Sequence, residues 1–407
     1  MISRPLANTL SLVLLALGVG LIALLLHVNQ HIQQQMENNV EGIDMVVGAK
    51  GSPLQLILSA VYHIDAPTGN ISLNEAERLR KNPLVAQGIP LSYGDNYNGY
   101  RIVGTNHNYP ALYEAALSEG QLWQKAFEVT LGYQVASKLN LKVGDTFAGS
   151  HGLTQGGEAH GTHAYQVVGI FEYTNSVVDQ LILTATESVW EVHNHEEGDH
   201  DEHEADGHDG HEEESHEAHG QEAHETDKEI TAMLVKFRNP IGMVQLPRMV
   251  NENTNMQAAV PVYEISRLFG LLGVGVNTLS TIALVIMAVS ALSVFISLFS
   301  ALKDRQYEMA LMRTHGATRW QLVWLVMQEG LLITLLGFVL GILLSRLGLW
   351  LMSGLMEESY HYTLSAWTLG VNEGWLLLIS MAIGVLAALL PAIRVFNLNI
   401  SRTLANA

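Results

Sequence analysis

Four long apolar segments constrain this chain more than any other feature of its sequence. A helix needs about 20 apolar residues to cross a bilayer, and each of the four segments supplies that length. They lie at residues 6–28, within 268–302, at 321–352 and at 373–393. The sequence therefore predicts a membrane protein with one transmembrane helix, a large domain and then three more helices.

The first segment is predicted to remain as a helix rather than to be cleaved as a signal peptide. Its apolar run is longer than the usual hydrophobic region of a signal peptide, and no A-x-A cleavage site follows it. The polar stretch LHVNQHIQQQ continues the helical pattern instead. The predicted domains are the first helix at 1–28, an external domain at 29–265, and a transmembrane domain at 266–407.

The basic residues near the ends of the spans set the expected orientation. These residues are Arg4, Lys303, Arg305, Arg313, Arg319, Arg394 and Arg402. Cytoplasmic loops of membrane proteins carry an excess of lysine and arginine. Both termini and the loop at 303–320 are therefore expected in the cytoplasm, and residues 29–265 on the outer side of the membrane.

The external domain is predicted to be α+β. Alternating apolar residues indicate strands at 100–106, 164–172, 180–185 and 230–237. Helical patterns lie at 134–141 and at 72–83, where Ser72 is expected to cap the helix with Glu75 three residues later. The apolar stretch 42–65 is expected to be a core element and not a fifth span, because glycines, Lys50 and Pro53 interrupt it.

A histidine-rich and acidic tract at residues 193–225 interrupts this domain. It holds nine histidines and fourteen carboxylates without a lysine or arginine. Removing those carboxylates changes the formal net charge from −19 to about −5, so the acidity is local. The composition predicts a disordered insertion in a connection between two elements, and the chain has no basic patch of the kind that binds nucleic acid.

The tract is expected to bind transition metals. It contains three consecutive octads that each begin H-x-x-H, and positions three apart share a face if the tract is helical. Imidazole with carboxylate suits zinc, copper(II) or nickel, and the chain has no cysteine to offer thiolates. The candidate ligands are His193, His195, His200, His203, His208, His211, His216, His219 and His224. A second candidate cluster, His151, His160 and His163, lies in a predicted loop at 151–163. A solvated linker and a pH-responsive segment remain open as alternatives.

The loop between the second and third spans carries the most specific pattern. Its residues RQYEMALMRTHGATR form a charged amphipathic helix pattern that breaks at Gly316. Together with LSEGQLWQKAFEVTLGYQVASKLNLKVGDTF in the external domain and the ending LLPAIRVFNLNISRTLA, this segment resembles the FtsX/MacB-type permease family of ABC transporters. The resemblance covers nearly the whole chain, and the histidine tract departs from the family's usual form.

The resemblance implies that this loop contains a coupling helix that docks on an ATP-binding subunit. The coupling residues it implies are Arg305, Glu308, Met309, Leu311, Arg313, Gly316 and Ala317. No G-x-x-x-x-G-K-[ST] motif occurs, so ATP must bind to a separate partner chain. The resemblance also implies a permease homodimer that transmits motion through the membrane. It implies a multi-pass protein of the bacterial inner membrane, with the large domain in the periplasm.

The expected function is mechanical, and the chain is not expected to be an enzyme because it shows no nucleophile–base pattern. The first hypothesis is an ABC permease linked to zinc or other transition-metal homeostasis, with a periplasmic metal-binding protein as a further partner and membrane lipid around the helices. The second is an exporter or lipoprotein-release permease whose tract buffers metal. The third is a membrane-anchored metal sensor that signals without transport.

Overall fold

The computed structural model describes residues 5–150, 159–199, 228–360 and 371–396. The chain divides into two compact units, a helical unit formed by residues 1–34 with 269–407 and an α+β unit formed by residues 35–268. The helical unit contains four helices that are long and apolar enough to cross a membrane among the described residues. This confirms the predicted arrangement of one span, a domain and three spans.

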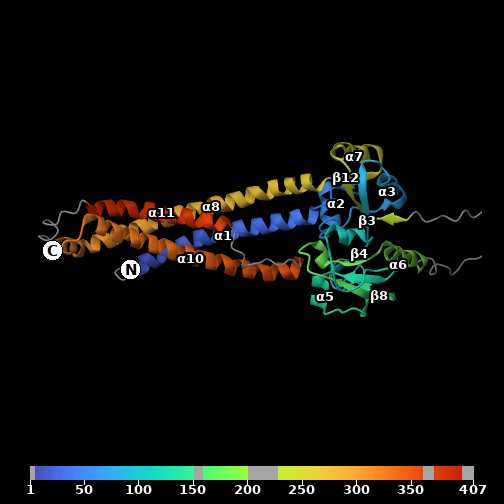
Figure 1. Cartoon of the computed structure of the whole chain (residues 1–407), viewed down its shortest axis with the longest axis horizontal. Helices are drawn as coiled ribbons and strands as arrows, with labels where there is room; N and C mark the ends of the chain where they lie inside the picture. Colours follow the sequence, from blue (N-terminus) through green and yellow to red (C-terminus); the bar gives the residue numbers. More distant parts are fainter. Residues whose placement is uncertain (1–4, 151–158, 200–227, 361–370, 397–407) are drawn as a thin grey trace, which may run out of the picture. The chain divides into compact units, whose positions relative to one another are not determined.

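The helical unit is a bundle of four long helices, and one short helix lies between the second and the third of them along the chain (Figure 1). Its elements are α1 (Pro5–Val40), α8 (Pro261–Asp304), α9 (Gln306–Thr314), α10 (Arg319–Tyr360) and α11 (Val371–Phe396). Helix α1 therefore includes the polar stretch after the first apolar segment, as the sequence predicted. Helices α1 and α10 pack closely at glycines, because a Cβ atom on Gly20 would come within 2.9 Å of the Gly341 carbonyl oxygen.

The α+β unit is built on a ten-stranded mixed sheet. The strand order is β12-β1-β11-β3-β4-β9-β6-β8-β5, with β7 beside β3 and β8. Neighbouring strands are antiparallel except for the parallel pairs β4–β9 and β6–β8. The strands of this sheet are β1 (Met45–Ala49), β3 (Val85–Tyr97), β4 (Tyr100–Thr105), β5 (Leu117–Gly120), β6 (Glu128–Leu131), β7 (Thr146–Ser150), β8 (Ala159–Phe171), β9 (Ile182–Ala185), β11 (Ala232–Phe237) and β12 (Met256–Ala259). The strands β2 (Ile71–Ser72) and β10 (Glu229–Ile230) pair with each other in a separate two-stranded sheet.

Short helices cover this sheet and divide its apolar residues into two cores. The helices are α2 (Pro53–Ala60), α3 (Leu73–Arg80), α4 (Asn108–Leu112), α5 (Tyr133–Leu139), the 3-10 helix η1 (Val177–Gln180), α6 (Thr186–Asp199) and α7 (Pro240–Asn253). One core gathers around β1, β11, α3 and α7, and the other around β4, β6, β8 and α5. Each of the four predicted strands lies on observed strands, and the apolar stretch 42–65 forms β1 and α2 in the core, as predicted.

Three local predictions need correction. Ser72 occupies the position before α3, but its side chain makes no capping hydrogen bond, because Ser72 belongs to β2 and pairs with Glu229. The predicted loop at 151–163 ends earlier, since β8 begins at Ala159. Helix α6 continues to Asp199 and so includes the first seven residues of the tract that was predicted to be disordered.

Candidate functional site

Helix α9 forms a short amphipathic segment between α8 and α10. Arg305 interrupts the helical backbone after α8, and Gly316, with φ of 98°, makes the turn into α10. This left-handed backbone conformation favours glycine. Met309 and Ala310 are buried, and Met309 packs in a cluster with Leu302, Leu322, Val326 and Ala392. The inner face of α9 is thus fixed to the ends of the transmembrane helices.

The outer face of α9 carries apolar side chains that the bundle leaves uncovered. Tyr307, Leu311 and Met312 are 50%, 43% and 42% exposed, and Glu308 is exposed beside them. Residues at these spacings share one side of a helix. Three apolar residues and a carboxylate therefore form a compact surface, which we call the α9 face.

The other predicted coupling residues hold the segment in place. Arg313 Nη1 donates a hydrogen bond to the Ala317 carbonyl oxygen at 2.8 Å, which ties the end of α9 to the chain beyond Gly316. Arg305 lies 3.9 Å from a Glu329 carboxylate oxygen on α10. Met309 is only 5% exposed, so its contacts are with the bundle.

The candidate metal ligands are mostly outside the described residues. His193 and His195 lie in α6, and His160 and His163 lie in β8. The tract histidines from His200 to His224 and His151 lie outside the described part of the chain. Within the described ranges no group of three or more histidines and carboxylates could hold a metal ion, so the metal-binding predictions stay predictions.

Residues that precede and follow the tract contact each other at Trp190. Its indole Nε1 donates a hydrogen bond to the Glu229 carbonyl oxygen at 2.6 Å, and the Lys228 ammonium lies 4.9 Å from the centre of its ring. Through Trp190, α6 contacts the residues at the start of β10, so the chain before residue 200 and the chain after residue 227 are already joined at this point. A deletion within the tract should therefore leave the fold of the α+β unit intact.

The end of α1 is anchored inside the α+β unit by Asn39. The Asn39 side-chain oxygen accepts a hydrogen bond from the Val177 amide at 3.0 Å, and the Asn39 carbonyl accepts one from the Tyr113 hydroxyl at 3.0 Å. Asn39 is fully buried. This single residue connects the helix end to the residue that follows α4 and to the first residue of η1.

A buried histidine joins α2, β3 and α4 within the same unit. The Tyr93 hydroxyl donates to the Ser59 carbonyl at 2.6 Å, so the His63 Nδ1–H must donate to Tyr93 at 2.9 Å. The opposite ring nitrogen then accepts from the Tyr109 hydroxyl at 2.8 Å. Burial, and next the Arg101 guanidinium, hold the pKa of His63 well below its ordinary value, so this ring is neutral at pH 7.

Acidification is expected to destabilise the α+β unit through His63. Below about pH 6.5 the unfolded chain binds a proton at this residue that the folded chain excludes, so stability falls as pH falls, by up to about 1.4 kcal/mol per pH unit. His63→Asn should flatten this slope, because asparagine tolerates the φ of 56° and does not titrate. Thermal unfolding of the full chain between pH 7 and pH 5 measures it. Tyr109→Phe is the control: it removes one hydrogen bond and should lower stability at both pH values while keeping the slope.

A second buried polar cluster, which the sequence analysis missed, lies in the helical unit. Arg346 on α10 donates to a carboxylate oxygen of Glu373 on α11 at 2.5 Å, and to His27 Nε2 on α1 at 3.0 Å. The exposed fractions of the three side chains are between 7% and 14%. The signal was available in the sequence, since Arg346 is the only charged residue between Glu329 and Glu357. Such residues in a membrane-spanning segment are functional candidates by default.

Comparison with known families agrees with this architecture. The model described as MacB-like periplasmic core domain matches residues 9–205, and the model described as FtsX-like permease C-terminal matches residues 280–400. The chain belongs to the FtsX/MacB-type permeases, the membrane subunits of ABC transporters that work with a separate ATP-binding subunit. This confirms the family that the sequence motifs indicated.

Two solved structures are similar to the α+β unit at low sequence identity. The periplasmic region of MacB from Actinobacillus actinomycetemcomitans is 11% identical, with 58% of this chain and 98% of that chain covered and a TM-score of 0.35. The extracellular domain of the noncanonic ABC-type transporter YknZ from Gram-positive bacteria is also 11% identical, with 53% and 98% covered and a TM-score of 0.31. Structural similarity at this identity and TM-score does not indicate the function of this chain. Among curated proteins, no relative matches this chain.

Proposed function

We propose that this chain couples ATP hydrolysis on a separate cytoplasmic subunit to work in the periplasm, and that this work is linked to zinc or another transition metal. The observation that supports coupling is the α9 face, an exposed apolar surface on a helix whose inner side is fixed to the bundle. Helix α1 offers the path to the periplasm, because the same helix continues beyond the bundle and its last turn contains Asn39, which is hydrogen-bonded within the α+β unit. In this proposal two copies form the working permease, with both termini in the cytoplasm.

The metal link rests on the tract and on its place in the fold. Nine histidines among fourteen carboxylates give a ligand set that suits zinc, copper(II) or nickel. The hydrogen bond from Trp190 to Glu229 supports this role, because it joins the chain on both sides of the tract, and metal binding in the tract then need not disturb the two cores. Its role in this proposal is to collect or sense the ion on which the permease, or a metal-binding partner protein, acts.

Zinc binding is expected to depend on the tract. The three H-x-x-H pairs predict roughly three zinc ions per chain, which a variant lacking residues 200–225 with His193→Gln and His195→Gln should not bind. Equilibrium dialysis with metal analysis of the purified full-length protein measures the stoichiometry. Equal zinc binding by the whole chain and the variant would remove the tract from any metal function.

The functional proposal is tested by ATP hydrolysis. The complex of permease and ATP-binding subunit, reconstituted in nanodiscs, should change its hydrolysis rate with free zinc when the tract is present and lose that response in the same tract variant. If both complexes respond alike, or if neither responds, zinc is not part of the coupling cycle and the tract serves at most as a buffer.

A further inference from the structure

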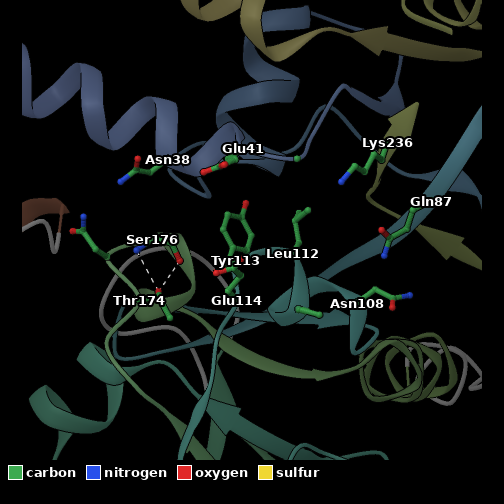
Figure 2. Close-up of a pocket in the computed structure, with 13 residues that line it drawn as sticks. Asn38, Glu41, Gln87, Asn108, Leu112, Tyr113, Glu114, Thr174, Ser176 and Lys236 are labelled. Carbon is green, nitrogen blue, oxygen red and sulfur yellow. Dashed lines mark hydrogen bonds between the residues drawn. The ribbon is translucent and has the colours of Figure 1, made fainter. Parts of the chain in front are cut away.

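A polar cavity of about 600 Å³ opens in the α+β unit beside the residues that follow α1 (Figure 2). The chain leaves the helix at Val40 and turns at Gly42, whose φ is 79°. Most residues that line the cavity are polar. They are Asn38, Glu41, Gly42, Gln87, Asn108, Ala111, Leu112, Tyr113, Glu114, Thr174, Asn175, Ser176 and Lys236.

One wall of this cavity offers hydrogen-bond donors for an anionic group. Lys236 on β11 and Gln87 on β3 are direct partners in the antiparallel pairing of these strands, so their side chains lie next to each other on one face of the sheet. Figure 2 shows both side chains at the same side of the cavity. Within the described residues Lys236 makes no ion pair within 4.0 Å. A primary ammonium beside a carboxamide is a donor set that suits a carboxylate.

Two carboxylates elsewhere in the lining offer the opposite charge. Glu41 follows the end of α1, and Glu114 follows α4 with φ of 51°. Both side chains are exposed to the cavity, and Tyr113 reaches from α4 toward the end of α1, where its hydroxyl is bonded to the Asn39 carbonyl (Figure 2). Glu41 and Glu114 make no ion pair among the described residues either. They are therefore available to an ammonium group.

The floor and the rim of the cavity limit the size and polarity of a ligand. Leu112 and Ala111 are the apolar contacts, and the carboxamides of Asn38 and Asn108 add neutral donors and acceptors. The rim at 174–176 is held firmly, since the Asp179 carboxylate accepts from both the amide and the hydroxyl of Thr174 at 2.9 Å. A preformed site with few apolar atoms favours a small, strongly polar molecule.

We propose that this cavity binds a small zwitterion of the size of an amino acid or a dipeptide. The ligand carboxylate lies at Lys236 and Gln87, and its ammonium lies at Glu41 and Glu114. A free divalent cation is disfavoured by the lysine and by the lack of any group of three metal ligands among the described residues. A free anion is disfavoured by the two carboxylates. The proposal goes beyond the coupling function and does not depend on the histidine tract.

Binding at this site would act directly on the end of α1. Glu41 and Gly42 come immediately after the helix, and Asn39 is already tied to Val177 and Tyr113. A ligand held by both Glu41 and Lys236 would add a link from the helix end to strands β3 and β11. The site therefore gives the α+β unit a means to respond to a periplasmic solute, or to select one.

The experiment is equilibrium dialysis of the full-length permease in nanodiscs against two mixtures of probes. One mixture holds the common free amino acids and the other holds small dipeptides, and mass spectrometry identifies what is enriched on the protein side. We expect at least one zwitterion to be enriched. Its N-acetylated form and its C-terminal amide should each bind at least about tenfold more weakly, because each lacks one of the two charges. Absence of enrichment in both mixtures would overturn the proposal.

Matched variants locate the site. Lys236→Gln and Glu41→Gln should each weaken the same ligand by about tenfold or more, whereas Lys125→Gln and Glu119→Gln change exposed charges outside the cavity and should leave binding unchanged. Enrichment that survives both cavity variants would place the ligand elsewhere and contradict the assignment.

Spermidine, a cation without a carboxylate, is the counter-probe. If it binds tightly, and if Glu41→Gln removes this binding while Lys236→Gln does not, the site binds cations instead of zwitterions. None of these results bears on zinc binding or ATP hydrolysis, so they are distinguishable from a failure of the proposed function.

Discussion

Replacing Leu311 with aspartate is expected to release the ATP-binding subunit from the permease. Leu311 is 43% exposed on the α9 face and lies between Tyr307 and Met312, which are also exposed. A central apolar residue of an interface costs about 2 kcal/mol or more when it is truncated, and a charge in its place adds desolvation. Affinity should therefore fall by about 30-fold or more. Co-purification and titration of the ATP-binding subunit against the permease in nanodiscs measure this loss.

Arg313→Met gives the informative comparison on the same helix. Its side chain does not belong to the α9 face but donates to the Ala317 carbonyl, so its loss should loosen α9 from α10 and leave the docking surface in place. We expect the complex to assemble and to hydrolyse ATP, while ATP no longer changes hydrogen exchange at residues 35–43. Glu308→Lys should also uncouple the complex, and the exposed Thr314→Ala should behave as wild type. Full affinity in Leu311→Asp, or normal coupling in Arg313→Met, would contradict the role assigned to α9.

The spans and helix α9 were predictable because their signals are local. An apolar run long enough for a bilayer, or a glycine after a short amphipathic pattern, is visible within a few dozen residues. Helix α9 ends at Thr314 before Gly316, as the break in the pattern indicated. The same holds for the existence of β4 and β11, although all of β4 and the first four residues of β11 are buried, where an alternating pattern predicts burial on one face.

The cavity and the error at Ser72 show what a local pattern cannot supply. Lys236 and Gln87 meet only because β11 pairs with β3 in one register, although they lie far apart in the sequence. Ser72 has the right residue type for a helix cap, but its backbone pairs with Glu229, whose strand follows the histidine tract. Long-range strand pairing decided both outcomes, and a single sequence does not show which strands pair.

The cluster of Arg346, Glu373 and His27 is a contact of this long-range kind, and it is expected to be essential to the helical bundle. Three helices, α1, α10 and α11, each contribute one side chain. Arg346 can only donate, so it satisfies Glu373 and the His27 ring nitrogen at once. The second Glu373 oxygen has no partner among the described residues, which makes that carboxylate depend on Arg346.

Arg346→Met should therefore destabilise the bundle by about 3 kcal/mol or more, since it leaves a carboxylate buried and unpaired. Glu373→Gln alone should cost less, because glutamine can still accept from Arg346 and carries no charge. The double variant should be more stable than Arg346→Met, with a coupling energy of at least about 1 kcal/mol. Unfolding of the full-length protein by titration with sodium dodecyl sulfate measures all three. If the two single effects instead add to within about 0.5 kcal/mol, the pair does not stabilise the bundle as a unit.

In the expected case, the charge cluster and the glycine contact of Gly20 with Gly341 together fix α1 against α10. Motion that begins at α9 can then reach α1 as movement of one packed body.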